Sequence, residues 1–365
     1  MPRAAVTSMI LPDLQTHCTF PFRKSRYHKF LSAKTKAWFF RGRDEDYKIQ
    51  CATFKGLKPA LLAAVSYPTA GYPQLRLCSD FLTYFFFLDD LSGELDKADT
   101  KSVADVVLNL RYHPYTYRSS TRISEMAKDI HDQAQARTSG GIPTLEEYII
   151  LRRDTSGCKT CWALIECGVV LGFAFNDFLS IFPDANNLDI PEEVHEHPVI
   201  RGLSDSANDA VAWANDLYSY KVESSRNDTH NMVVVVMDKR NLDLRQAVDL
   251  VGKMCEEAIN RFKTLRTQVL SWRTKIEEDV AQYIQGMADW MVAVSVYWSF
   301  ETERYFGKAN KSVKSTRIVQ LSQHLFIPGK DVGIDSALLQ LTCLRAYGMK
   351  SKFALQLFIQ VIMGR

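Results

Sequence analysis

The chain has 365 residues, of which 46% are hydrophobic and 24% are charged, so it can bury a substantial core and is not a disordered protein. Its net charge of +3 is small, and its basic and acidic residues are interspersed, which argues against a nucleic-acid partner. The longest apolar run, residues 167–175, is too short to cross a bilayer, and the N-terminal stretch is interrupted by Pro12 and Asp13. With eight cysteines and no leader, we expect a reduced, cytoplasmic protein without stable membrane insertion.

The long segments carry apolar residues at mixed three- and four-residue spacing, which predicts helices. The run MVVVVM at 232–237 favours a strand by composition, but we interpret it as a buried helix because a lone strand is unstable. Several helices are apolar nearly all round, so other helices must enclose them. The predicted fold is all-α, one helical bundle over residues 1–365. Its helices are predicted over residues 46–67, 75–96, 144–157, 204–225, 243–273 and 278–306.

The helix predicted over 75–96 ends in FFFLDDLSGE, where Asp89, Asp90 and Glu94 follow aromatic residues. Carboxylates at the end of a buried helix are costly unless a cation meets them, although the helix could also simply emerge into water here. Asp90 and Glu94 share a helix face, whereas Asp89 and Asp90 point about 100° apart. All three are candidate metal ligands.

The helix predicted over 144–157 ends in LRRDTSG, in which Arg152 and Arg153 precede a break at Gly157. Cys158 and Cys161 follow as a CxxC pair. A zinc site would need a second such pair and a redox motif would need a βαβ unit, and neither is present, so we interpret these cysteines as structural thiols.

The stretch NDLYSYKVE, residues 215–223, sets Asn215, Ser219 and Glu223 four residues apart, on one stripe of a helix. A solvated face is the ordinary interpretation of such a stripe. The alternative is a hard-cation site, because Mg²⁺ takes oxygen ligands and leaves room for water and phosphate. The second acidic group near Asp89 favours the cation site.

A last motif, FETERYFG, places Arg304 and Tyr305 at the end of a long apolar helix. The guanidinium of arginine fits phosphate oxygens, and tyrosine adds a hydroxyl donor. Metal ligands and arginines around a pocket of aromatic residues describe a site for a diphosphate joined to an apolar tail.

These motifs resemble those of the class I terpene synthases, in particular the sesquiterpene synthases of mushroom-forming fungi. The similarity covers most of residues 10–310. It implies an α-helical barrel around an apolar pocket, three Mg²⁺ ions, and cyclisation of farnesyl diphosphate, a small-molecule substrate. By this resemblance Asp89 leads the aspartate-rich motif, while Asp90 and Glu94 are available beside it. The remaining implied site residues are the metal ligands Asn215, Ser219 and Glu223, the diphosphate sensor Arg153, the helix-break residue Gly157, and the diphosphate-binding Lys221, Arg304 and Tyr305.

Loss of diphosphate leaves an allylic cation, which needs a dry cavity with aromatic faces. Candidates to line that cavity are Tyr84, Phe85, Phe86, Trp213 and Trp298. No histidine or glutamate is placed as a dedicated base, so the diphosphate or a bound water could take the final proton.

Three features depart from the family pattern. Gly93 stands where an acidic residue is usual, so the motif must use Asp90 and Glu94 or rely on Asp89 alone. Val222 replaces the lysine that often precedes the glutamate of the triad Asn215, Ser219 and Glu223, with Lys221 one position earlier. The stretch between Arg153 and Asn215 is longer than in the family, and the surplus corresponds to residues 167–184, either a retained intron or a true insertion. Residues 315–365 match the family poorly.

Two rival functions remain. A chain-elongating prenyltransferase would share the fold and the metals but would need a second aspartate-rich motif. A catalytically impaired terpene synthase-like protein would keep the motifs but lose activity through Gly93 and the insertion.

Overall fold

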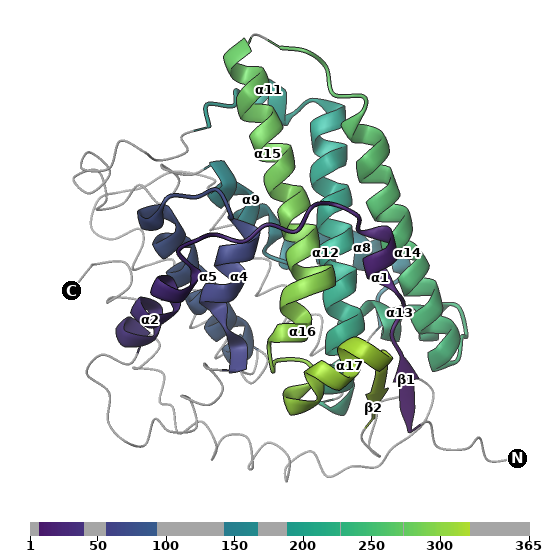
Figure 1. The fold of residues 1–365 in the computed structure, drawn as a ribbon. Helices are drawn as coiled ribbons and strands as arrows, with labels where there is room; N and C mark the ends of the chain where they lie inside the picture. Colours follow the sequence, from purple (N-terminus) through teal and green to yellow (C-terminus); the bar gives the residue numbers. More distant parts are fainter. Residues whose placement is uncertain are drawn as a thin grey trace, which may run out of the picture.

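The computed structural model describes residues 7–39, 56–92, 142–166, 188–226, 228–272 and 274–321. Within these ranges the protein is a bundle of helices with one small sheet (Figure 1). The all-α fold predicted from the sequence is therefore confirmed. None of the helices in the described ranges is long and apolar enough to cross a membrane.

Helix α12 (Pro198–Ser225) is the centre of the bundle. It packs against α14 (Leu244–Arg266) and α15 (Thr274–Val292), which lie on either side of it in Figure 1. Pro198 at its first turn and His197, whose side chain accepts from the Val199 amide, start the helix six residues before the predicted position. Four buried alanines distributed around the helix let its neighbours approach closely: Ala207, Ala210, Ala212 and Ala214.

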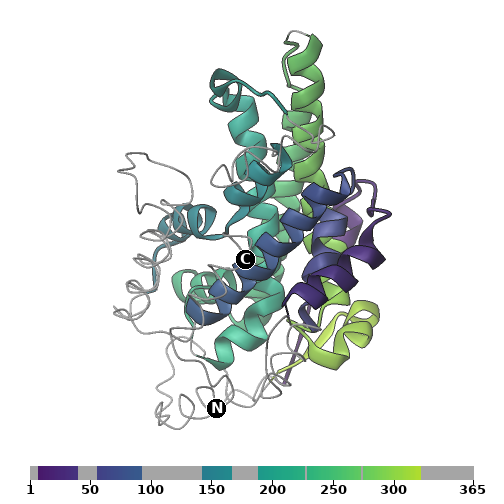
Figure 2. The same ribbon diagram turned by 90° about the vertical axis from the view of Figure 1, so that its left-hand side faces the viewer.

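A second layer is formed by α2 (His28–Phe39), α4 (Pro59–Ser66) and α5 (Tyr72–Ser92). Figure 2 shows this layer against the long helices. Every residue of α4 is buried, as predicted for a helix that is apolar all round. Residues 46–55 and 93–96, which were predicted to extend these helices, lie outside the described residues.

Helices α8 (Leu145–Thr155) and α9 (Cys158–Glu166) are separated by a break at Gly157. Thr144 and Glu147 form a capping box at the start of α8. Gly157 has φ +73°, and a Cβ atom there would lie 2.3 Å from Cζ of Phe85. A glycine is required on both counts, since it alone adopts this conformation freely and leaves the space empty.

The last long helix changes its winding before it ends. α15 continues into a π-helical turn, η2 (Ala293–Trp298), and a final turn, α16 (Ser299–Glu301). At Thr302 the backbone becomes extended, and its hydroxyl donates to the Gly56 and Leu57 carbonyls at 2.9 and 3.1 Å. The helix predicted over 278–306 therefore stops at 301.

The run MVVVVM forms α13 (Met232–Lys239), confirming the predicted helix, and its first six residues are buried. Helix α14 ends at Arg266 rather than at residue 273. The shorter elements are α1 (Leu14–His17), α11 (Glu192–His195), η3 (Gly307–Ala309) and α17 (Asn310–Thr316).

The small sheet was not predicted. Strand β1 (Ser8–Ile10) pairs antiparallel with β2 (Ile318–Gln320), with Met9 opposite Val319. Three residues are too few to show an alternating pattern, and the two strands lie at opposite ends of the described chain.

Candidate active site

The polar stripe of NDLYSYKVE lies in the C-terminal half of α12 and does not face open solvent. Ser219 is 6% exposed, and its buried Oγ has no hydrogen-bond partner among the described residues. Asn215 and Glu223 are half-buried. An unpartnered buried hydroxyl between an amide and a carboxylate is a set of oxygen donors that a hard cation could satisfy.

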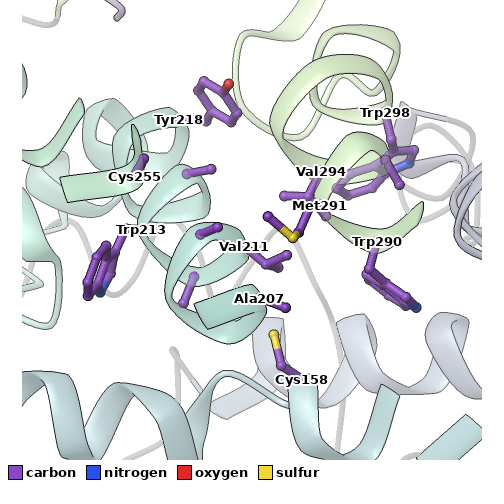
Figure 3. Close-up of a cluster of buried hydrophobic side chains, with 14 of the residues drawn as sticks. Cys158, Ala207, Val211, Trp213, Tyr218, Cys255, Trp290, Met291, Val294 and Trp298 are labelled. Carbon is purple, nitrogen blue, oxygen red and sulfur yellow. The ribbon is translucent and has the colours of Figure 1, made fainter. Parts of the chain in front are cut away.

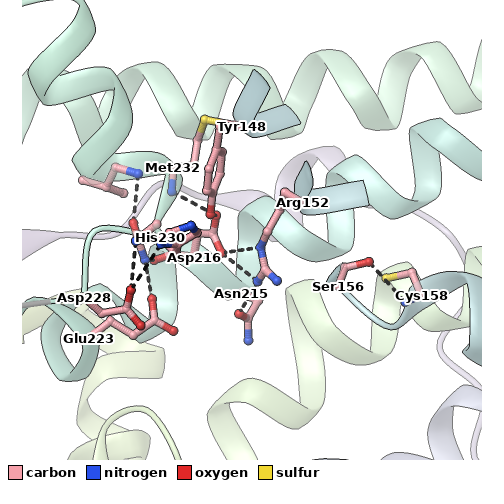
Figure 4. Close-up of polar contacts among 12 residues, drawn as sticks. Tyr148, Arg152, Ser156, Cys158, Asn215, Asp216, Glu223, Asp228, His230 and Met232 are labelled. Atoms are coloured by element: carbon pink, nitrogen blue, oxygen red, sulfur yellow. Dashed lines mark hydrogen bonds and ion pairs between the residues drawn. The ribbon is translucent and has the colours of Figure 1, made fainter. Parts of the chain in front are cut away.

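Three separate motifs meet at Asn215. Its amide Nδ2 donates to the Tyr305 hydroxyl at 2.7 Å, and its Oδ1 accepts from Nη2 of Arg152 at 2.9 Å. Figure 4 shows Arg152 reaching this amide from α8. The structure therefore brings together the triad helix, the LRRDTSG helix and the RY pair.

Glu223 sits among other carboxylates. Its burial, followed by the charges of Asp228 and Asp216, raises its pKa to about 8. Asn231 donates to its Oε2 at 2.8 Å and also caps α13 by accepting from the Val233 amide. A cation bound beside this carboxylate would lower its pKa again.

Asp216 was missed by the sequence analysis. It is fully buried, and its carboxylate accepts from Arg152, from the Tyr148 hydroxyl and from the Met232 amide (Figure 4). A carboxylate on a helix face with Ala212, Trp213 and Tyr220 around it was the available signal, because such a group must find a partner.

Arg153 points along α12 away from the triad. Its guanidinium forms two bonds of 2.7 Å with Asp209 and one of 3.3 Å with Asp205. Asp209 also accepts from Arg261 of α14. Asp209 precedes Asn215 by six residues, roughly 9 Å along the helix axis. The role of Arg153 as a diphosphate sensor stays a prediction, and in this structure Arg152 is the arginine that contacts the triad.

Arg304 and Tyr305 lie in the turn that follows α16. The guanidinium carbon of Arg304 is 4.9 Å from the ring centroid of Phe86, which stacks on Trp298 at 5.3 Å. Trp298 also meets Tyr305 edge to face at 5.9 Å. The predicted diphosphate-binding pair is thus anchored on aromatic residues of α5 and η2.

The predicted cation-lining aromatics divide into groups. Phe85 lies against Gly157 and stacks on Phe81 at 6.1 Å. Trp213 lies on the opposite side of α12 from Met291 and Trp298 (Figure 3), so it belongs to a different part of the core. The side chain of Tyr84 lies outside the described residues.

The backbone carbonyl of Gly157 accepts from the Cys161 amide at 3.0 Å, the first bond of α9. Its predicted contact with a substrate cation remains a prediction. Lys221 is half-buried on α12, and its side chain makes no hydrogen bond or ion pair with the residues the structure describes.

The aspartate-rich motif is only partly within the described structure. Asp89 and Asp90 belong to the last turn of α5, but their side chains lie outside the described residues, as does all of Glu94. Their metal-binding role stays a prediction. Elsewhere in the described ranges, no three His, Cys, Asp or Glu side chains gather as metal ligands.

The CxxC cysteines are buried free thiols. Burial raises the pKa of Cys158 to about 11, which keeps it protonated at neutral pH. Inert thiols in the core agree with the structural interpretation.

A separate cavity of about 240 Å³ lies among α4, α5, α9 and α15. Tyr67, Cys78, Leu164 and Asp289 are among the residues that line it, and none of the predicted site residues does.

The fold and these motifs define a class I terpene synthase. A family model described as "Terpene synthase family 2, C-terminal metal binding" matches residues 100–261. The chain is 47% identical over 350 residues to sesquiterpene synthase Agr1 of Cyclocybe aegerita, covering 88% of this chain and 96% of that protein. It is 43% identical to sesquiterpene synthase 1 of Postia placenta, covering 87% and 96% of the two chains. The chain therefore belongs to the terpene synthase family, and it is an enzyme.

Solved structures agree at the level of the fold. Germacradien-4-ol synthase from Streptomyces citricolor superposes with a TM-score of 0.60 at 21% identity, covering 77% of this chain and 96% of that one. A hedycaryol synthase superposes with a TM-score of 0.59 at 18% identity, covering 80% and 99%.

Proposed function

We propose that the protein is a sesquiterpene synthase that ionises farnesyl diphosphate with the help of Mg²⁺, cyclises the resulting cation and releases diphosphate. The similarity to named sesquiterpene synthases of fungi supports the fifteen-carbon substrate class. The observation that carries the proposal is the convergence of Asn215, Tyr305 and Arg152 beside the unpartnered hydroxyl of Ser219.

The triad fits a magnesium ion. Asn215, Ser219 and Glu223 supply an amide, a hydroxyl and a carboxylate oxygen, and Mg²⁺ prefers oxygen ligands with room for water and phosphate. The position of Glu223 near the charges of Asp228 and Asp216 supports the same assignment, because a bound cation would offset a cluster of carboxylates. Asp89, Asp90 and Glu94 are proposed to hold the other ions, three in all.

When bound, Mg²⁺ acts as a Lewis acid on the diphosphate oxygens. Arg304 and Tyr305 donate to the same oxygens, so that negative charge developing on the leaving group is stabilised. Lys221 and Arg153 are proposed to add positive charge at the same group, and Arg153 must first leave Asp209. Arg261, which already donates to Asp209, would keep that buried carboxylate paired.

Phe85 and Phe86 are proposed to face the carbocation, since aromatic rings stabilise positive charge and exclude water. Gly157, against which Phe85 lies, is proposed to present its carbonyl to the cation at the helix break. The sequence motifs predict no dedicated base, so we propose that diphosphate or water takes the last proton.

Glu223→Ala tests the proposal. Removal of a metal ligand should lower the rate of diphosphate release from farnesyl diphosphate on the order of a hundredfold or more. The same assay in EDTA should give no turnover, and Glu257→Ala on the exposed face of α14 is the matched control. Full activity of Glu223→Ala would contradict the metal site.

The same assay separates the rival functions. A wild-type protein that releases no diphosphate would be a catalytically impaired terpene synthase-like protein. Elongation of farnesyl diphosphate by isopentenyl diphosphate would identify a prenyltransferase. Analysis of volatile products identifies the cyclised hydrocarbon that the proposal expects.

A further inference from the structure

Asp216 follows a proposed metal ligand in the sequence but is not available to a metal. Its Oδ1 accepts from Nε and Nη2 of Arg152 at 3.0 and 2.8 Å. Its Oδ2 accepts from the Tyr148 hydroxyl at 2.8 Å and from the Met232 amide at 3.0 Å. With four donors on two oxygens and a side chain only 1% exposed, the carboxylate is fully occupied. Any influence on the site must pass through the groups it holds.

The group that connects Asp216 to the site is the guanidinium of Arg152. Its Nη2 donates to Asp216 and also to Oδ1 of Asn215, at 2.8 and 2.9 Å. Because a guanidinium can only donate, the amide oxygen of Asn215 must be the atom that faces Arg152. The amide nitrogen is turned to the Tyr305 hydroxyl at 2.7 Å. The two contacts hold the amide in one orientation.

The orientation leaves a ligand atom available. An amide oxygen has two lone pairs, and Arg152 takes one of them. The second is open to a cation. The arrangement has an electrostatic cost, however, because a positive guanidinium one hydrogen bond from a ligand oxygen repels a cation bound there. The carboxylate of Asp216 on the same guanidinium offsets that charge.

We propose that Asp216 and Arg152 are positioning residues for the metal site: Arg152 fixes the amide of Asn215, and Asp216 fixes and neutralises Arg152. This inference rests on the proposed function, because it takes Asn215 as a ligand of Mg²⁺. The alternative is a purely structural role, in which the buried ion pair only stabilises the packing of α8 against α12 and the start of α13.

Removing one or both charges separates the two interpretations. Asp216→Asn leaves the positive charge of Arg152 without a carboxylate to offset it beside the bound cation. The Mg²⁺ concentration at the midpoint of binding should therefore rise about tenfold or more. The double variant Arg152→Gln, Asp216→Asn loses the orientation but also the repulsion. It should therefore bind Mg²⁺ more tightly than Asp216→Asn alone. A purely structural pair predicts no such recovery.

The measurement is thermal unfolding of the full chain during a Mg²⁺ titration at fixed inorganic diphosphate. The midpoint of the rise in melting temperature reports Mg²⁺ binding without turnover, and the Mg²⁺ dependence of kcat and KM is measured beside it. The control is Arg245→Gln, Asp249→Asn, which removes an exposed ion pair on α14 and should leave the midpoint unchanged. Tyr148→Phe removes one hydrogen bond to Asp216 and no charge, so its shift should be smaller than that of Asp216→Asn.

The inference is overturned if folded Asp216→Asn keeps the wild-type midpoint, or if the double variant binds Mg²⁺ no better than Asp216→Asn. Should Asp216→Asn fail to fold, Arg152→Lys decides the question, since lysine keeps the charge but lacks the planar fork by which Nε and Nη2 hold Asp216 while Nη2 also reaches Asn215. An unchanged midpoint in Arg152→Lys also overturns it. Asn215→Ala distinguishes failure of the proposed metal site from failure of the positioning role. A wild-type Mg²⁺ midpoint in Asn215→Ala refutes the metal site itself. If Asn215→Ala loses the response to Mg²⁺ while Asp216→Asn keeps the wild-type midpoint, only the positioning role is refuted.

Discussion

At the scale of single residues, Gly157 carries the sharpest steric constraint near the site. Its φ is +73°, and Phe85 occupies the space of a Cβ atom. Gly157→Ala should therefore destabilise the protein by about 1–3 kcal/mol, through backbone strain and displacement of the ring. Urea unfolding measures the loss. Adding Phe85→Leu should recover part of it, and an alanine variant as stable as the wild type would contradict the predicted strain.

Asp80 gives a pH dependence of stability. Its burial raises its pKa from 3.8 to about 7, although Arg76 lies at 2.9 Å. The folded state therefore holds the proton more tightly than the unfolded state, and this contribution to stability is present at low pH and lost as pH rises from about 4 to 7. The wild type should therefore lose stability from pH 5 to pH 8, and Asp80→Asn should lose less, so that the free energy of unfolding of the variant rises relative to that of the wild type. Urea titrations at both values test this, with exposed Asp249→Asn as control; equal pH dependence of wild type and Asp80→Asn would refute it.

The site residues that could not be predicted from the sequence are those whose role depends on a partner far away along the chain. Asn215, Ser219 and Glu223 could be predicted as candidate ligands because one helix fixes their spacing. Asp216 lies on the same helix, but its partner Arg152 is 64 positions away, and only the packing of α8 on α12 brings them together.

At the scale of elements, the predicted helices were most reliable where apolar periodicity is long. Helix α13 could be predicted because its β-branched run had no partner strand. The ends of helices were less predictable. Helix α16 ends at Glu301, where the hydroxyl of the next residue, Thr302, donates to the Gly56 carbonyl. This contact joins segments far apart in the sequence.

The described residues on either side of the surplus segment lie close together. The Leu188 amide donates to the Glu166 carbonyl at 3.3 Å, so the chain leaves and returns at one place. Deleting residues 167–184 joins Glu166 to Ala185 and leaves three residues before Leu188. The same hydrogen bond then has the four-residue spacing of a helical turn, and neither flank has to move. We expect the shortened protein to fold, with a higher soluble yield and higher activity.

A control for this deletion replaces residues 167–184 with a Gly/Ser linker of equal length, which separates the effect of length from that of apolar composition. Soluble yield, melting temperature and diphosphate release are compared among the three proteins. If the deletion unfolds the protein or abolishes the activity of the full chain, residues 167–184 are a required structural element and the retained-intron alternative is wrong.

At the scale of the whole molecule, the bundle brings α12, α8 and the turn that carries Tyr305 together at Asn215. The sequence predicted the class of fold and, through its motifs, that these three segments lie together, whereas the side chains of the aspartate-rich motif lie outside the described residues. It could not predict that Arg152 rather than Arg153 would contact the triad, because adjacent residues on a helix differ only by a rotation of about 100°. Which of them faces α12 is decided by the angle at which α8 packs.

The closure of the chain by β1 and β2 gives the last prediction. Val319 is 2% exposed and lies opposite Met9 in the core, whereas its neighbour Ile318 is 40% exposed on the other face. Val319→Ala should lower the free energy of unfolding by about 1–3 kcal/mol, because it removes buried methyl groups and leaves a cavity.

Ile318→Ala is the matched control for Val319→Ala in the same strand, and it should change stability by no more than about 0.5 kcal/mol. Both values come from urea unfolding of the full chain. Equal, small effects at the two positions would mean that β2 adds nothing to the core and that the pairing of β1 with β2 does not stabilise the protein. A large difference would establish that residues beyond 315, where the family resemblance fades, are part of the folded enzyme.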